Sequence, residues 1–143
     1  MKMMKRHIVP WAFLVAAGLA AAGCGGAIQL TGTQIASGAD AELNISDAHG
    51  GSRMVELHAT HLPPPARLRQ GMTVFALWAK TRGQSRLLGF MEYDEGSREG
   101  TARGTTPYPT FQVILTAERN RTPQEPSDAV VFRQGGGAAA RNE

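Results

Sequence analysis

Apolar and polar residues alternate with a period of two in several segments of the chain from about residue 42 onward. The segments 42–45, 54–60 and 111–118 carry apolar side chains at every second position, which is typical of a β-strand with one buried face. Within residues 72–79, positions 74–78 are apolar without interruption and predict a central strand that is covered on both faces, or one whose outer face meets a loop.

More polar segments complete the predicted strands. Residues 87–93 predict a strand in which Gly89 marks a bulge or a close approach of two backbones. Residues 98–106 predict a polar edge strand, and residues 129–133 close a set of seven. Turns rich in Gly and Pro separate the strands, and helical spacing of apolar residues is not seen after the N-terminal segment. The chain is therefore predicted to be all-β, an immunoglobulin-like antiparallel β-sandwich.

Residues 1–23 have a different pattern from the rest of the chain. The basic residues Lys2, Lys5 and Arg6 precede an uncharged stretch from residue 8 to residue 23. A basic segment, a short apolar segment and small residues before a cleavage site are typical of a secretory signal peptide, here expected to be helical. A transmembrane helix needs about 20 apolar residues, so this stretch is too short for one.

Cys24 directly follows the small residues of this segment, and the arrangement resembles the lipobox of bacterial lipoproteins. The resemblance implies that the Cys24 thiol is acylated and that this residue begins the mature chain. Ala21 stands where the lipobox usually has Leu, and a plain secreted protein or a retained anchor are the alternatives. Gly25, in place of Asp, favours the outer membrane where the host has two membranes.

Composition divides the remainder of the chain into three parts. Residues 24–38 are rich in Gly, Ala, Thr and Gln and predict a flexible tether, with room for one short strand at 28–31. Residues 39–134 predict the β-sandwich domain, and residues 135–143 predict a disordered tail. Because Cys24 is the only cysteine, the fold is expected to rest on its apolar core without an intramolecular disulfide.

The formal net charge of +3 belongs to the signal peptide. Lys2, Lys5 and Arg6 are three of the fifteen basic residues, so twelve basic and twelve acidic residues remain from Cys24 onward. A neutral mature chain without a basic, aromatic-containing patch argues against nucleic acid as a partner.

Short motifs follow one another in a defined order: Leu62-Pro63-Pro64, Phe75-Ala76-Leu77-Trp78, Leu88-Gly89-Phe90, Leu115-Thr116-Ala117-Glu118, and Pro126-Ser127 before Val130-Val131. In this order they resemble the extracytoplasmic C-terminal domain of the anti-sigma-K factor family over residues 55–133. The resemblance implies a β-sandwich and an outer, sensory module. We expect no counterpart of the family's cytoplasmic helical domain or spanning helix, so anti-sigma activity is not implied.

His58 and His61 form a His-x-x-His pair and are weak candidates for a metal site. Residues three apart on a strand point to opposite faces, and such a site needs a further ligand, for which Glu56 is the nearby candidate. Exposed histidines, with no metal and no other cofactor, are expected instead. Trp78 is expected to anchor the core rather than to form a ligand platform, and the acidic segment 94–99 to form a solvated hairpin tip.

The chain is therefore predicted to be a lipid-anchored, extracytoplasmic β-sandwich attached to the membrane through Cys24. We expect a non-enzymatic interaction, structural or sensory accessory module at the cell envelope, with an envelope protein as the candidate partner. Phosphate-loop, nucleophile-elbow and zinc-protease motifs are absent from the sequence. The alternative is a small-ligand or metal-binding envelope lipoprotein that uses His58 and His61 or an aromatic pocket near Trp78.

Overall fold

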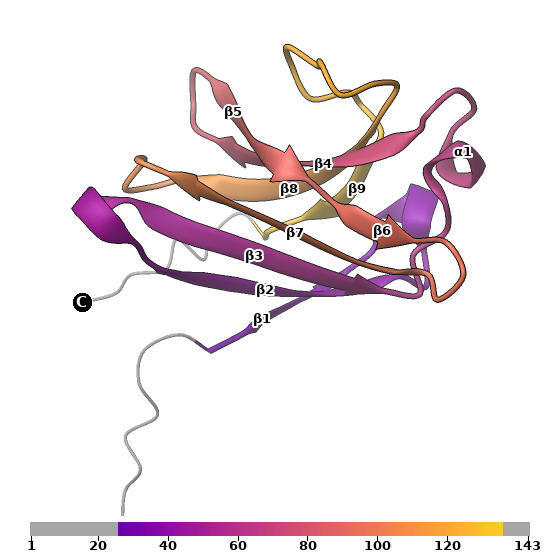
Figure 1. Ribbon diagram of the computed structural model, residues 1–143, viewed down its shortest axis with the longest axis horizontal. Coiled ribbons are helices and arrows are strands. Elements are labelled where there is room, and N and C mark those ends of the chain that lie inside the picture. Colours follow the sequence, from indigo (N-terminus) through magenta and orange to yellow (C-terminus); the bar gives the residue numbers. More distant parts are fainter. Residues whose placement is uncertain (1–25, 136–143) are drawn as a thin grey trace, which may run out of the picture.

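The alternating segments form nine strands in two antiparallel sheets that pack face to face (Figure 1). The computed structural model describes residues 26–135. One sheet has the order β1-β2-β3-β7-β6, and the other has the order β5-β4-β8-β9. The strands are β1 (Ile28–Thr31), β2 (Asp40–Asp47), β3 (Arg53–Thr60), β4 (Val74–Lys80), β5 (Ser85–Phe90), β6 (Glu92–Asp94), β7 (Glu99–Thr106), β8 (Gln112–Glu118) and β9 (Val130–Arg133).

In the described part of the chain, helical structure is limited to three short turns: η1 (Gln34–Ala36), η2 (His49–Gly51) and α1 (Pro65–Leu68). A proline begins α1, where the missing N–H has no helical partner to lose. Within residues 26–135, no helix has the length and hydropathy of a membrane span.

The strand order is that of an immunoglobulin-like sandwich. Strands β2-β3-β7-β6 correspond to A-B-E-D, and strands β5-β4-β8-β9 correspond to C′-C-F-G. The predicted fold class is confirmed, although the described residues form nine strands instead of seven. The two additional strands are β1, at the edge of the five-stranded sheet, and β6, which the sequence pattern joined to β5.

The main core lies between the sheets. Alternate positions of β2 and β3 supply Leu43, Val55 and Leu57, and the facing sheet supplies Phe75 and Leu77, all almost fully buried. Burial of such a side chain contributes about 1.5–3 kcal/mol. The core is therefore built from the residues that the period of two selects.

The short strand that the sequence allowed at residues 28–31 is present as β1, but residues 28–38 belong to the sandwich and do not form a flexible tether. Strand β1 pairs with β2 along its whole length, and Leu30 and Ala36 are buried in the main core. The Thr33 N–H donates a hydrogen bond of 2.9 Å to the Val131 carbonyl in the other sheet. The many small and polar residues conceal these few apolar positions in the sequence.

The predicted strand 87–93 is two strands because the chain crosses between the sheets at Met91. Strand β5 lies in one sheet and β6 in the other, and the Met91 N–H donates to the Phe75 carbonyl at 2.9 Å. The β4–β5 register shifts opposite Gly89, where a Cβ would lie 2.6 Å from the Arg103 carbonyl oxygen. Both expectations for this glycine, a bulge and a close backbone approach, are confirmed.

Strand β7 lies between β3 and β6, so the prediction of an edge strand is wrong. Its positions facing the other sheet include Gly100, Ala102 and Gly104, which explains the weak apolar signal. A Cβ on Gly104 would collide with the Leu88 carbonyl, and one on Gly100 would collide with Met91. Small residues are needed here because β5 passes close over β7.

Trp78 is buried as predicted, but on the opposite face of its sheet from the main core. It forms a second buried cluster with Ala76 and Ile114, and the half-buried residues around them are Leu87, Phe90 and Val130. The β8–β9 loop, residues 119–129, rises on the outer side of this sheet (Figure 1). Strand β4 is thus covered on both faces, as its continuous apolar run predicted.

A buried chain of hydrogen bonds joins this cluster to the β8–β9 loop. The Trp78 Nε1–H donates to Thr116 Oγ1 at 2.9 Å, and the Thr116 hydroxyl donates to Glu118 Oε1 at 2.6 Å. The Ser127 N–H donates to the same oxygen at 2.8 Å, and the Ser127 hydroxyl donates to the Ala117 carbonyl at 2.6 Å. Each buried polar atom in this chain therefore has a partner.

Candidate functional site

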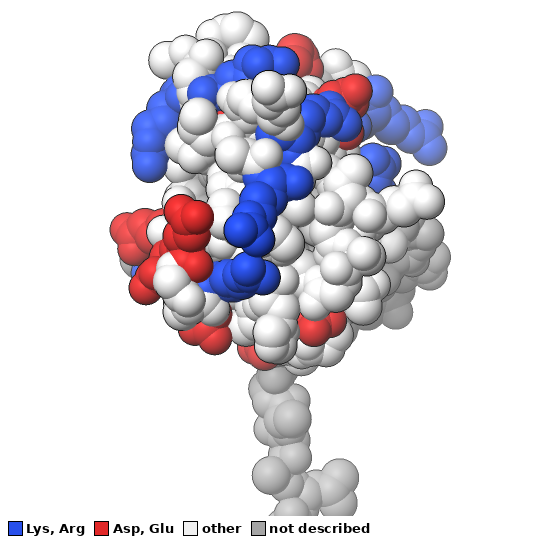
Figure 2. All heavy atoms as spheres, turned by 90° about the vertical axis from the view of Figure 1, so that its right-hand side faces the viewer, with Lys and Arg blue, Asp and Glu red and all other residues white. Residues whose placement is uncertain are grey.

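Charge is divided between the two sheets. The strands of the five-stranded sheet carry seven carboxylates and two arginines, whereas those of the four-stranded sheet carry three basic residues and the buried carboxylate of Glu118. In Figure 2, Lys and Arg side chains gather over the upper part of this end of the molecule and a group of Asp and Glu side chains lies at the lower left. The electrostatic field at the surface therefore arises from where the charged side chains lie and not from the net charge of the chain.

Strand alternation directs six of these carboxylates to the outer face of the five-stranded sheet. Strand β2, for example, buries Ala41 and Leu43, so the side chains of Asp40 and Glu42 point to solvent. We call this surface the acidic face; its carboxylates are those of Asp40, Glu42, Glu56, Glu92, Asp94 and Glu99.

The strand register arranges the acidic face in rows. Glu42 lies opposite His58, His58 opposite Thr101, and Thr101 opposite Glu92, so one row crosses four strands. The next row places Glu99 of β7 opposite Asp94 of β6. These residues are far apart in the sequence, and only the register brings them onto one surface.

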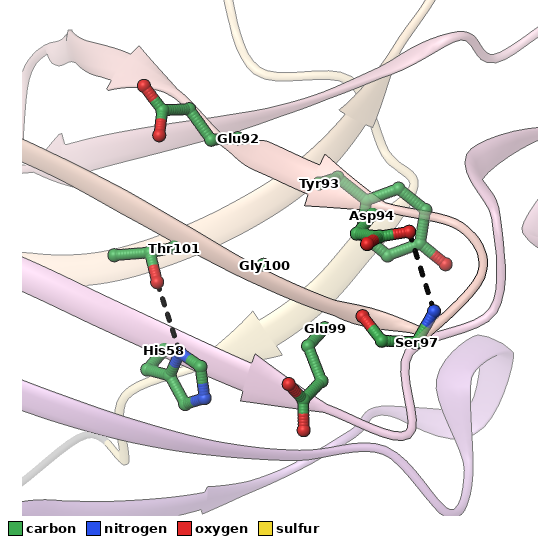
Figure 3. A pocket seen from close by; sticks show the side chains of 8 residues that line it. All are labelled: His58, Glu92, Tyr93, Asp94, Ser97, Glu99, Gly100 and Thr101. Atoms are coloured by element: carbon green, nitrogen blue, oxygen red, sulfur yellow. Dashed lines mark hydrogen bonds between the residues drawn. The ribbon is translucent and has the colours of Figure 1, made fainter.

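An open hollow of about 370 Å³ lies on the acidic face beside the β6–β7 turn (Figure 3). The His58 ring lies against β7, with Nδ1 3.0 Å from Thr101 Oγ1, and Glu99 extends beside it. Asp94 Oδ1 accepts the Gly96 N–H at 2.8 Å. The exposed side chains of this hollow can attract a cationic group, and the Thr101 contact holds the imidazole in place.

Asp94 and Glu95 lie at and beside the tip of the β6–β7 hairpin, as the sequence predicted. The Asp94 carboxylate caps backbone N–H groups of its own turn, which gives it a structural role there.

His58 and His61 have different partners. His58 contacts Thr101, whereas His61, in a left-handed backbone conformation with φ of 54°, places Nδ1 3.8 Å from Asp40 Oδ2. Within residues 26–135, no three His, Cys, Asp or Glu side chains come together in a group that could hold a metal ion. Glu56, the nearby candidate for a further ligand, places Oε2 3.7 Å from Arg103 Nε.

Tyr93 lies on the inner side of the β6–β7 hairpin. Its hydroxyl donates to the Leu62 carbonyl, and its ring meets Phe75 edge to face with centroids 5.2 Å apart. Burial raises the pKa of Tyr93 above its usual value, and the Glu95 carboxylate adds to this effect. The protonated phenol, which donates the hydrogen bond to Leu62, is therefore favoured to a higher pH than in a solvent-exposed tyrosine.

The sequence drew attention to single residues, and the structure assembles a surface. His58 lies within the acidic face and His61 directly follows the end of the same strand, while the predicted lipidation site, Cys24, lies outside the described residues. The rows of carboxylates were missed because they depend on the register of four strands. The outward-pointing acidic residues at alternate positions of β2, β3 and β7 were the sequence signal from which this surface could have been predicted.

Comparisons with protein-family models, curated proteins and solved structures found no match.

Proposed function

We propose that this chain is a lipid-anchored, extracytoplasmic interaction module of the cell envelope, without enzymatic activity, that binds a basic partner protein through its acidic face. The observation that carries the proposal is the excess of seven carboxylates over two arginines on the strands of the five-stranded sheet. A sensory accessory role is the form of this function that the resemblance to the anti-sigma-K outer domain favours.

The start of β1 supports a position close to the membrane. Strand β1 begins at Ile28, four residues after Cys24, and four residues span at most about 14 Å. A lipid on Cys24 would therefore hold the edge of the five-stranded sheet near the membrane surface. This limits the partner to a protein whose basic segment lies at a similar height.

The acidic face is suited to electrostatic recognition rather than to a large apolar contact. Its carboxylates lie on paired strands, so their spacing is set before a partner binds, and Arg103 is the basic residue among them. Complementary charge accelerates association and excludes partners of the same sign. A partner rich in Lys and Arg is therefore favoured, and binding should weaken at high ionic strength.

The anchor is tested by comparing the unaltered protein with Cys24→Ser. The unaltered protein should fractionate with membranes and incorporate a radiolabelled fatty acid, and the variant should do neither because the acylated thiol is lost. A Ser46→Ala variant, at an exposed strand position, should behave as the unaltered protein does. Membrane association and labelling of the Cys24 variant would overturn the anchor.

The acidic face is tested by photo-crosslinking in intact cells. A photoreactive amino acid at Thr101 reports on the acidic face, and the matched control at Gln84 reports on the exposed β4–β5 turn of the other sheet. The Thr101 variant should give a discrete adduct that is lost when Glu42 and Glu92 are both replaced by Gln, and the Gln84 variant should not. Equal adducts from both positions, or an adduct that survives the Gln substitutions, would overturn the assignment.

A further inference from the structure

A cleft opens at the corner where the chain leaves one sheet and enters the other. Strand β5 ends at Phe90 and β6 begins at Glu92, so the start of β4 is not covered by β5. The cleft has a volume of about 540 Å³, within the range of small-molecule sites. The crossing between the sheets is therefore also the origin of a cavity.

Apolar atoms form about half of the accessible wall of this corner cleft, and polar atoms form the other half. Phe75 and Tyr93 meet edge to face at an interplanar angle of 79°, and buried Met91 lies beside them. Val74 and Phe90 are half-buried and border the cleft. The accessible aromatic surface is thus at Phe90 and Tyr93, whereas Trp78, which the sequence singled out, is 1% exposed.

The polar atoms of the walls already have partners. The Tyr93 hydroxyl donates to the Leu62 carbonyl, and the Thr73 hydroxyl donates to the Arg119 carbonyl at 2.7 Å. They hold the cleft in shape and leave its charged groups to recognise a ligand.

Arg121 is the basic residue of the corner cleft. Its guanidinium carbon lies 5.2 Å from the centroid of the Phe90 ring, a stacked arrangement that holds an arginine side chain in place. Among residues 26–135 it has no hydrogen bond or ion pair. Its five N–H donors are thus available to an anionic group that enters the cleft.

We propose that the corner cleft binds a small organic anion in which a carboxylate contacts Arg121 and a ring packs between Phe90, Val74 and Tyr93. Glu92 also lines the cleft and is exposed, so its carboxylate disfavours a ligand that carries a second negative charge. This inference goes beyond the proposed function, because it requires neither the lipid nor a protein partner on the acidic face.

Titration of the full chain with phenylacetate, followed by ligand-observed NMR and calorimetry, tests the proposal. Saturable binding is expected, and the neutral phenylacetamide and the cationic phenethylamine should each bind about tenfold or more weakly, because they lose a charge-assisted hydrogen bond. Equal binding of acid and amide, tighter binding of the amine, or no binding up to about 10 mM of the acid would overturn the proposal.

Variants locate the site. Arg121→Gln should weaken phenylacetate binding about tenfold or more, and Val74→Phe should block the cleft. Arg86→Gln, an exposed arginine on β5 outside the cleft, is the matched control and should bind as the unaltered protein does. Circular dichroism establishes that each variant is folded. Equal losses in Arg121→Gln and Arg86→Gln would mean that the acid binds by net charge alone and would overturn the assignment.

Discussion

The hydrogen-bond chain behind the four-stranded sheet makes Thr116→Val a sharp test of the fold. Valine keeps the shape of threonine but removes the hydroxyl that links Trp78 to Glu118. The indole N–H of a side chain that is 1% exposed would lose its partner, at a cost of about 1–3 kcal/mol. Glu118 Oε1 would keep only the Ser127 N–H, which adds about 1 kcal/mol.

The sum is about 2–4 kcal/mol, a large part of the roughly 5–15 kcal/mol that stabilises a domain. The midpoint of thermal unfolding should fall by about 8–16 °C, since 1 kcal/mol corresponds to roughly 4 °C at this chain length. Urea unfolding followed by circular dichroism measures the free energy of unfolding and should give an unchanged slope.

Thr105→Val is the matched control, because Thr105 is exposed on β7. This substitution should change the free energy of unfolding by less than about 0.5 kcal/mol. A Thr116→Val variant that loses no more stability than Thr105→Val would refute the reasoning. Combining Thr116→Val with Trp78→Phe should cost less than the sum of the two, by about 0.5 kcal/mol or more, and strict additivity would show that the two side chains are not linked.

Two further measurements test the hairpin and the sheet crossing. Because burial raises the pKa of Tyr93, the unfolded chain releases this proton first, so stability should fall as the pH rises above about 10. Tyr93→Phe should reduce that decline between about pH 8 and pH 11 in urea unfolding, and an equal decline in both proteins would contradict the prediction. Gly104→Ala places a Cβ against the Leu88 carbonyl and should destabilise the fold by about 1–3 kcal/mol. Gly83→Ala, in open space, should change it by less than about 0.5 kcal/mol, and equal effects would be inconsistent with a tight crossing.

The fold class was predictable because each strand buries one face locally. Leu43, Val55 and Leu57 stand at alternate positions of β2 and β3, and all three are in the main core. Strands with small inward residues, such as Gly100 and Gly104 of β7, were harder to interpret. These residues must be small because the neighbouring sheet lies close to them, and the local sequence pattern carries no information about that contact.

The candidate surfaces were less predictable. His58 could be named as a candidate from the sequence, but its position between Glu42 and Thr101 depends on the register of three strands. Arg121 and Phe90 lie in a loop and a strand more than thirty residues apart, and they meet only because the β8–β9 loop turns back toward the end of β5.

The sequence by itself determined the local preferences of this protein: the signal-like N-terminus with Cys24, the extended segments and the apolar side of most strands. Tertiary structure decided the incorporation of residues 28–38, the place of Trp78 behind its sheet, the acidic face and the corner cleft. The physical reason is the range of the interactions. Alternation is set by neighbours along the chain, whereas register, sheet crossing and loop placement depend on contacts between segments that the sequence keeps far apart.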